Sequence, residues 1–348
     1  MAKGSSSGDR PRRPTLQDVA DRVGTSKMTI SRYLRDPQQV AEATREQIAA
    51  VMAELGYIPS RVPDMLANAK SRAIGVLLPS MSNQVFASVV RGIESITQPA
   101  GYHCLYAHYG YDALREEEQI RQLLSFHIDG LILSETVHTD TTLRMLDVAG
   151  IPVVEVMELP ARPIDQAVGM DHEAAATAMV NAMLTCGKRH IAYLAARLDR
   201  RTLLREAGYR AAMTAAGLVP CVIASEASSS FSLGGELLQQ ARQALSDLDG
   251  VFCTNDDIAA GALLAAQAHG LRVPEDLAVA GSNALDIGRA LSPQLASIVT
   301  PREQIGRLAA ERLLARINGE HFATPVIDAG FTLFHGGSLG TASQQENT

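Results

Sequence analysis

From residue 73 onward, short apolar runs alternate with amphipathic stretches, and this alternation restricts the fold more than any other feature of the chain. Strands that alternate with helices predict parallel sheets covered by helices on both faces. The pattern continues for so long that two Rossmann-like subdomains fit it better than one. The apolar runs lie at 73–78, 128–133, 151–156, 191–194, 251–253 and 277–280, and the amphipathic stretches include 83–100, 112–127, 172–186 and 257–269.

Residues 15–57 carry a different pattern, which predicts three short helices. Thr15 opens the first helix with a sequence that resembles a capping box, and Gly24 ends it. Ser26 is a suitable N-cap for the second helix, and the third is expected at about 42–55. Three short helices with a glycine-containing turn between the first two are typical of a helix-turn-helix. The expected fold class is therefore α/β, with an N-terminal helix-turn-helix followed by two Rossmann-like subdomains.

The net charge of −7 argues at first against a nucleic-acid partner. The charge is uneven, however: residues 1–60 hold nine Lys or Arg and seven Asp or Glu, a balance of +2, so the remainder carries −9. A local positive face is sufficient for phosphate contacts. The N-terminus lacks the apolar core of a signal peptide, and no run approaches the roughly 20 apolar residues of a membrane helix. We therefore expect a cytoplasmic protein without a membrane partner.

The common motifs of enzyme and metal sites are missing from the sequence. It has no GxGxxG, P-loop, GxSxG, HExxH or EF-hand pattern. Its four cysteines are widely separated, so neither a zinc site nor a disulfide framework is expected. The acidic run at 116–118 is interpreted as a solvated helix face, and the scattered histidines as surface or satisfied core residues. We expect no catalysis, no metal and no cofactor apart from a small-molecule effector.

Polar residues follow four of the predicted strands at the point where each strand ends, at 80–84, 134–135, 255–257 and 282–283. Open α/β sheets bind ligands at the carboxyl ends of their strands. Each group is as compatible with an ordinary helix cap as with a ligand site. Four such groups together favour a small polar ligand whose hydroxyl groups bond to amides and carboxylates.

Residues 15–34, TLQDVADRVGTSKMTISRYL, strongly resemble the N-terminus of regulators of the lactose-repressor/galactose-repressor (LacI/GalR) family, from whose pattern Val23 and Thr25 depart. Further matches continue along most of the chain, for example at 55–59 (LGYIP) and 253–256 (CTND). Within the family the chain is most similar to gluconate-operon repressors. The resemblance implies a periplasmic-binding-protein-like body and a repressor of sugar-acid utilisation genes that leaves its operator when an effector binds.

The resemblance also implies that the second helix lies in the major groove of operator DNA and reads bases with its first residues. Arg32 is the strongest candidate for a bidentate base contact, and an ion pair with Asp36 is its alternative role. The residues implied to contact bases are Lys27, Met28, Thr29 and Arg32, and those implied to contact phosphate are Thr15, Ser26, Ser31 and Tyr57.

In the family, a hinge helix enters the minor groove, and this helix is expected here at about 63–69. Leu66 matches the leucine that wedges a central base step. Pro63 departs from the alanine of several relatives and is interpreted as the first residue of the helix. A two-fold homodimer on a pseudo-palindromic operator follows from the resemblance, while the absence of a leucine heptad in the C-terminal tail argues against a tetramer.

For the effector, Arg205 matches a family position that contacts ligand oxygens and would pair bidentately with the carboxylate of gluconate or a related sugar acid. Asn255 matches a second contact position. Asn283 stands where many sugar-binding members carry Asp, and its amide would not repel an anion. The other residues expected at the effector are Ser80, Asn83, Phe86, Ser134 and Phe231. Arg200 and Arg201 are interpreted as surface arginines or as contributors to a positive field.

The effector is expected to act by preferring one orientation of the two lobes. Within the family, a regulator of a neutral sugar or nucleoside is the alternative, and a transporter's sugar-binding protein is a more distant one.

The expected divisions are a disordered tail at 1–13, the helix-turn-helix at 14–59, a hinge at 60–72, an N-terminal subdomain at 73–170 and 301–327, a C-terminal subdomain at 171–300 and 328–338, and a flexible tail at 339–348.

Overall fold

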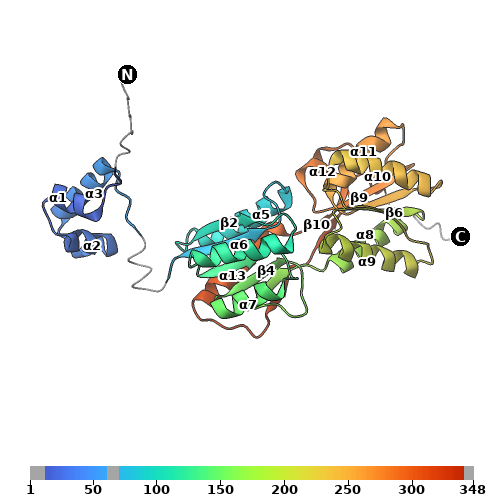
Figure 1. Ribbon diagram of the computed structural model, residues 1–348. Coiled ribbons are helices and arrows are strands. Elements are labelled where there is room, and N and C mark those ends of the chain that lie inside the picture. Colours follow the sequence, from blue (N-terminus) through green and yellow to red (C-terminus); the bar gives the residue numbers. More distant parts are fainter. Residues whose placement is uncertain (1–11, 61–69, 341–348) are drawn as a thin grey trace, which may run out of the picture. The chain divides into compact units, whose positions relative to one another are not determined.

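The computed structural model describes residues 12–60 and 70–340, which fall into two compact units that meet in sequence at residues 71 and 72. The whole of the hinge helix expected at about 63–69, with Leu66, lies outside the described residues, as do residues 1–11 and 341–348. Figure 1 shows the elements of both units.

The N-terminal unit contains the three expected helices and one additional 3-10 turn. Its elements are α1 (Leu16–Val23), α2 (Lys27–Arg35), η1 (Pro37–Gln39) and α3 (Glu42–Leu55). Thr15 completes a capping box on α1, and Ser26 caps α2 through its hydroxyl. Gly56 ends α3 at φ 61°, the left-handed conformation that glycine adopts without strain. Ile30 and Ile48 are fully buried at the centre of the unit, so a small apolar core holds the three helices together.

The larger unit contains two lobes, each built on a six-stranded sheet. The first lobe contains β1 (Ala73–Leu78), α5 (Gln84–Thr97), β2 (His103–His108), α6 (Ala113–Ser125), β3 (Gly130–Leu133), α7 (Asp140–Ala149), β4 (Val153–Met157), β5 (Gln166–Gly169), α13 (Arg302–Ile317) and β11 (Val326–Asp328). The second lobe contains α8 (His172–Thr185), β6 (Ile191–Ala196), α9 (Arg200–Ala215), β7 (Cys221–Ser225), α10 (Phe231–Ala244), β8 (Gly250–Cys253), α11 (Asp256–Ala268), β9 (Ala278–Ser282), α12 (Asp286–Ala290), β10 (Ala296–Val299) and β12 (Thr332–Phe334).

The strand order is β11-β5-β4-β3-β1-β2 in the first sheet and β12-β10-β9-β8-β6-β7 in the second. Neighbouring strands in both sheets are parallel except that β12 runs antiparallel to β10. The chain passes between the lobes after β5, after β10 and after β11. This arrangement is the expected α/β fold with two doubly wound subdomains.

Helices cover both faces of each sheet, as the apolar runs predicted (Figure 1). In β1, Ile74 and Val76 pack with α5 and α13, while Leu77 points to the opposite face and packs with α6 and α7. In the second lobe α8 and α9 cover one face, and α10 and α11 cover the other. Among the described residues, we find no helix that combines the length and the apolar character needed to cross a membrane.

Three expected domain boundaries differ in the structure, and so does the expected exposure of the acidic residues at 116–118. Leu339 is fully buried in the core of the second lobe, so a flexible tail does not begin at residue 339. Asp328 pairs with Gly169 in the first sheet, which moves that subdomain boundary by one residue. Arg12, expected in the disordered tail, forms an ion pair with Asp18 at 2.8 Å.

The acidic run at 116–118 is not uniformly solvated. The Glu116 side chain is 1% exposed, and its Oε2 lies 2.9 Å from Nδ1 of His138, which is also buried. Glu155 of β4 lies on the other side of the same imidazole, 3.7 Å from Nε2. Successive residues of a helix point in different directions, so one of the three acidic side chains, that of Glu116, faces the core.

Candidate functional sites

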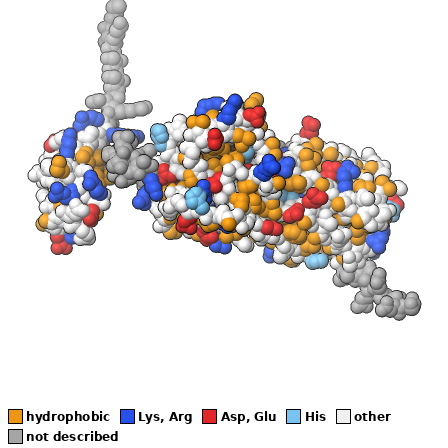
Figure 2. Space-filling view, turned by 90° about the horizontal axis from the view of Figure 1, so that it is seen from below, with side chains coloured by type: hydrophobic (Ala, Val, Ile, Leu, Met, Phe, Trp, Pro, Cys, Tyr) orange, Lys and Arg blue, Asp and Glu red, His pale blue; other side chains and the backbone are white. Residues whose placement is uncertain are grey.

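The exposed face of α2 presents side chains that have no partner within the described part of the chain. Met28 is 71% exposed, and Lys27 and Arg32 are exposed as well. Arg32 does not form the alternative ion pair, because the Asp36 carboxylate instead accepts hydrogen bonds from the η1 backbone at Gln38 (3.1 Å) and from Gln39. Figure 2 shows several basic side chains on the visible face of this unit, among apolar and acidic ones. These three side chains are free to reach a partner.

The residues expected to contact phosphate or to assist base contacts have additional roles within the unit. Ser26 Oγ accepts from the Thr29 amide at 3.2 Å and lies 3.0 Å from the Thr29 hydroxyl. Thr15 Oγ1 donates to Asp18 Oδ2 at 2.7 Å. Tyr57 is half-buried against the helical core, and burial raises the pKa of its hydroxyl. Ser31 of α2 is half-buried as well. Because all of these contacts lie within the unit, they do not test the DNA contacts, which stay predictions.

A cleft between the two lobes brings together five of the eight residues expected at the effector, namely Asn83, Phe86, Arg205, Asn255 and Asn283. The four polar groups that follow strands belong to two sheets, so it is two sheet edges, not one, that supply the site. Tyr111, Met157, His172, Arg197, Asp199, Arg201, Thr202, Ser229 and Asp257 also line it.

The three asparagines of the cleft are held by their side-chain oxygens. Asn83 caps α5 and Asn255 caps α11, each through Oδ1 at 3.1 Å from a backbone amide. Asn283 has φ 103°, and its Oδ1 accepts from Thr300 Oγ1 at 3.3 Å. The amide nitrogens of Asn83 and Asn255 donate to the hydroxyls of Tyr111 and Ser229, at 3.2 and 2.7 Å. Asn83 and Asn255 are therefore helix caps that also line the cleft.

Three of the expected effector residues do not line this cleft. The Ser80 hydroxyl bonds within its own turn, where it accepts from the Ser82 amide at 3.2 Å. Ser134 is buried, and its hydroxyl donates to the Leu77 carbonyl at 3.2 Å. Phe231 is 47% exposed at the start of α10. These three side chains do not line the described cleft, and their assignment to the effector stays a prediction.

Arg205 is buried on α9 with only neutral hydrogen-bond partners in the described structure. Its Nη1 bonds to His172 Nδ1 at 3.2 Å, and its Nη2 donates to Thr254 Oγ1 at 3.4 Å. Gly208 allows α9 to approach α8 this closely, since a Cβ there would lie 2.2 Å from the Glu173 carbonyl oxygen. The guanidinium therefore has no carboxylate hydrogen-bond partner in the described structure, and its charge is partly offset by the electrostatic attraction of Asp199, which lines the same cleft.

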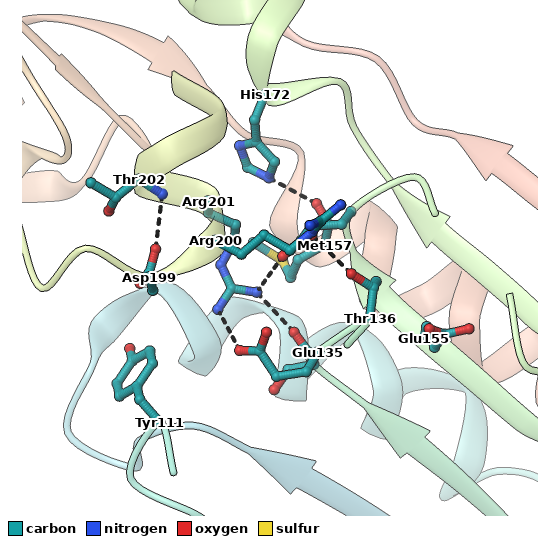
Figure 3. Close-up of polar contacts among 12 residues, drawn as sticks. Tyr111, Glu135, Thr136, Glu155, Met157, His172, Asp199, Arg200, Arg201 and Thr202 are labelled. Carbon is teal, nitrogen blue, oxygen red and sulfur yellow. Dashed lines mark hydrogen bonds and ion pairs between the residues drawn. The ribbon is translucent and has the colours of Figure 1, made fainter. Parts of the chain in front are cut away.

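Arg201, in contrast, is paired with acidic groups of the other lobe (Figure 3). Its Nη2 lies 3.3 Å from Glu135 Oε1, and its Nη1 lies 3.4 Å from Glu158 Oε1. Burial alone would lower the pKa of Arg201, but Glu135, Asp199 and Glu158 outweigh that effect and raise it. The interpretation of Arg201 as a surface arginine was wrong, whereas Arg200 is half-exposed and donates to Glu158 Oε2 at 2.9 Å.

Comparisons with known proteins agree with this architecture. Residues 15–60 match the lacI family of bacterial regulatory proteins, and residues 180–339 match the periplasmic binding protein-like domain. The chain is 56% identical to the HTH-type transcriptional regulator GntR of Escherichia coli (strain K12) over 330 residues, which cover 95% of this chain and 100% of that one. The chain belongs to the LacI family.

Solved structures of LacI-family proteins share the fold. A LacI-family transcriptional regulator from Silicibacter pomeroyi is 32% identical with a TM-score of 0.88, over 94% of this chain and 100% of that one. The lac repressor dimer bound to operator and an anti-inducer is 25% identical with a TM-score of 0.82, over 94% and 99% of the two chains. This LacI-family chain is a DNA-binding transcriptional repressor and not an enzyme, which confirms the family and fold predictions.

Sequence reasoning missed several cleft residues of this LacI-family repressor, chiefly Tyr111, His172, Arg197 and Asp199. Tyr111 follows β2, and His172 follows β5, and neither strand was expected. Arg197 and Asp199 follow β6, a strand that was expected, although no ligand site was predicted at its end. The rule that ligands bind at the carboxyl ends of strands points to Arg197 and Asp199 after β6, whereas Tyr111 and His172 follow strands that the apolar pattern did not predict.

Proposed function

We propose that the cleft of this repressor binds a sugar acid such as gluconate, and that Arg205 pairs with the acid's carboxylate. The observation that carries the proposal is the buried Arg205 guanidinium, whose partners His172 and Thr254 are neutral. A buried charge is costly unless it is paired, so such a group favours an anionic ligand. The amides of Asn255 and Asn283 are suited to the ligand's hydroxyl groups.

The effector would act by preferring one orientation of the lobes, because a ligand with equal affinity for both orientations shifts nothing. Operator affinity would fall as that orientation becomes populated. We further propose that the repressor acts as a homodimer on a pseudo-palindromic operator in the cytoplasm, since the two-fold symmetry of such a dimer matches that of the site.

Calorimetry on the full-length protein tests the effector. Gluconate and 6-phosphogluconate are titrated beside glucose as a neutral sugar. We expect at least one of the two acids to bind more tightly than glucose, and Arg205→Met to weaken its binding about 10- to 100-fold. Binding of glucose or a nucleoside in preference to both acids would contradict the sugar-acid proposal and favour a neutral effector.

Gel-shift assays test the DNA contacts. Arg32→Ala should reduce operator affinity by about 1–3 kcal/mol and leave binding to random DNA almost unchanged, as expected of a base contact. Arg35→Ala, on the same helix, is the matched control, because a phosphate contact would weaken binding to both DNAs alike. Leu66→Ala should weaken operator binding if the leucine wedges a base step. Equal losses on operator and random DNA would contradict the role of Arg32.

A further inference from the structure

His172 lies beside Arg205 in the cleft, and its protonation is defined by its surroundings. It is the first residue of α8 and is 3% exposed. Its Nε2 lies 2.9 Å from the carbonyl oxygen of Met157, as Figure 3 shows. Met157 itself has φ 83°, a left-handed conformation that is uncommon for a side chain of this size. Because a carbonyl oxygen only accepts, Nε2 must carry a proton.

The other ring nitrogen faces Arg205. Nδ1 lies 3.2 Å from Nη1 of Arg205, and a guanidinium only donates, so Nδ1 must be the unprotonated acceptor. The imidazole is therefore neutral. Burial, together with the charges of Arg205 and Arg201, lowers the pKa of His172 to about 3. Histidine thus joins the carbonyl of Met157 in one lobe to the guanidinium of Arg205 in the other.

The remaining donors of Arg205 are not used up by this anchor. Nε of Arg205 is buried without a hydrogen-bond partner within the described structure. An acidic residue in place of His172 would also orient the guanidinium, but it would cancel its charge. Arg201 shows that outcome in the same cleft, since its guanidinium is paired with Glu135 and Glu158.

We propose that His172 is a positioning residue that holds Arg205 without neutralising it and thereby gives the cleft its preference for an anionic effector over its neutral analogue. The proposal rests on the proposed binding of a sugar acid at Arg205. It adds that the preference depends on the neutrality of the side chain at position 172, and not only on the presence of the arginine.

Three substitutions separate shape from charge at this position. In His172→Asn the amide oxygen takes the place of Nδ1, so the acceptor for Arg205 is kept and the bond to Met157 is lost. His172→Asp has the same shape with a negative charge. His172→Gln reaches the Met157 carbonyl with its amide nitrogen but offers no acceptor where Nδ1 stood. A purely structural role for His172 would make Asn and Asp behave alike.

The affinity arm uses calorimetry of the full-length protein with gluconate and its uncharged analogue gluconamide. We expect the wild type and His172→Asn to prefer gluconate. His172→Asp should lose that preference, with a gluconate-to-gluconamide Kd ratio shifted by about 10- to 100-fold relative to His172→Asn. His172→Gln should weaken gluconate binding while keeping some preference for the anion. An equal ratio in the Asn and Asp variants would overturn the inference and leave the sugar-acid proposal intact.

A second arm needs no effector. Nitrogen NMR of the histidine side chains, with His172→Asn for assignment, should show a neutral Nε2–H tautomer that does not titrate between about pH 5 and 8. Arg205→Met should shift the Nδ1 resonance of His172. A His172 that titrates near 6.5, as an unperturbed histidine does, would overturn the inference. If the wild type binds neither gluconate nor 6-phosphogluconate, the proposed function fails, and this NMR arm still decides whether His172 is the neutral anchor of Arg205.

Discussion

Tyr111 and Arg197 meet across the cleft, one from each lobe. The Tyr111 hydroxyl accepts from Arg197 Nη1 at 2.9 Å, and the guanidinium carbon lies 4.4 Å from the centroid of the same ring. Asn83 Nδ2 also donates to this hydroxyl, at 3.2 Å. A single phenol therefore joins a helix cap of the first lobe to an arginine of the second, beside the other residues that line the cleft.

Tyr111→Phe removes the hydroxyl and keeps the ring under the guanidinium. Because a hydrogen bond to a charged donor contributes about 1.5–3 kcal/mol, the described lobe orientation should be less populated. We expect effector Kd to rise about tenfold with little change in Tm. Calorimetry and thermal unfolding check this result. Tyr102→Phe is the matched control, since we find no hydrogen bond from that hydroxyl among the described residues; a similar loss in both variants would contradict the role of Tyr111.

Asp256 should make the stability of the repressor fall as pH rises towards neutrality. Its carboxylate is fully buried and accepts from Ser297 Oγ at 2.7 Å and from the Leu285 amide. Burial raises the pKa of Asp256 from 3.8 to about 7. The folded state therefore holds a proton that the unfolded state has released between these pH values, and stability falls with rising pH across that window.

Asp256→Asn removes this titration and keeps the shape of the side chain. The free energy of unfolding of the variant, relative to wild type, should increase from pH 5 to pH 7 by up to about 1.4 kcal/mol for each pH unit. Urea unfolding across this range measures the difference. Asp286→Asn, at an exposed position, should follow the wild type. Parallel pH profiles for wild type and Asp256→Asn would show that Asp256 does not titrate in this window.

The fold followed closely from the sequence for the long apolar strands, but not for β5, which is fully buried yet only four residues long (QAVG). β1 has the expected bounds because its residues are apolar throughout, whereas β2 and β7 are half-exposed edge strands whose sequences, HCLYAH and CVIAS, include polar residues. The missed strands β2 and β5 concealed part of the site, since Tyr111 follows β2 and His172 follows β5. Arg205 and Asn255 were predicted from family resemblance, but the neutral partners of Arg205 come from α8 and from the segment after β8, which are distant in sequence, so no local pattern encodes these contacts.

His138 should stabilise the first lobe, and this contribution should vanish in alkaline solution. Its imidazole lies between the buried carboxylates of Glu116 and Glu155. Burial alone would lower the pKa of His138, but hydrogen bonds and charge from the two glutamates raise it to about 9. A folded-state pKa above the unfolded value means that the stabilisation is complete below about pH 6.5 and is lost as pH rises through 9.

His138→Asn leaves the two glutamates without their cation. We expect the variant to be about 3 kcal/mol less stable than wild type near pH 6.5, as for other broken buried ion pairs, with the difference shrinking by pH 10. Chemical unfolding at several pH values gives the comparison. His108→Asn, at an exposed position, should cost almost nothing. A loss that is constant from pH 6.5 to 10 would mean that His138 acts through packing instead of charge.

Glu158 should be the residue on which the ionic contact between the lobes depends most. Its carboxylate is 2% exposed and accepts from Arg200 Nε at 2.9 Å, Arg201 Nη1 at 3.4 Å and Thr136 Oγ1 at 3.0 Å. Glu158→Gln keeps the size of the side chain but replaces one acceptor oxygen with an amide that faces guanidinium donors. Since Arg201 retains Glu135, the loss of stability should be smaller than for a fully isolated buried charge, about 1–3 kcal/mol.

For Glu158→Gln we expect a lower urea midpoint and, in X-ray scattering without effector, a shift in the distribution of distances as the lobes separate. Glu226→Gln, at an exposed position, controls for the loss of one carboxylate, and an unchanged scattering profile with wild-type stability in Glu158→Gln would show that the lobes are held together by their other contacts.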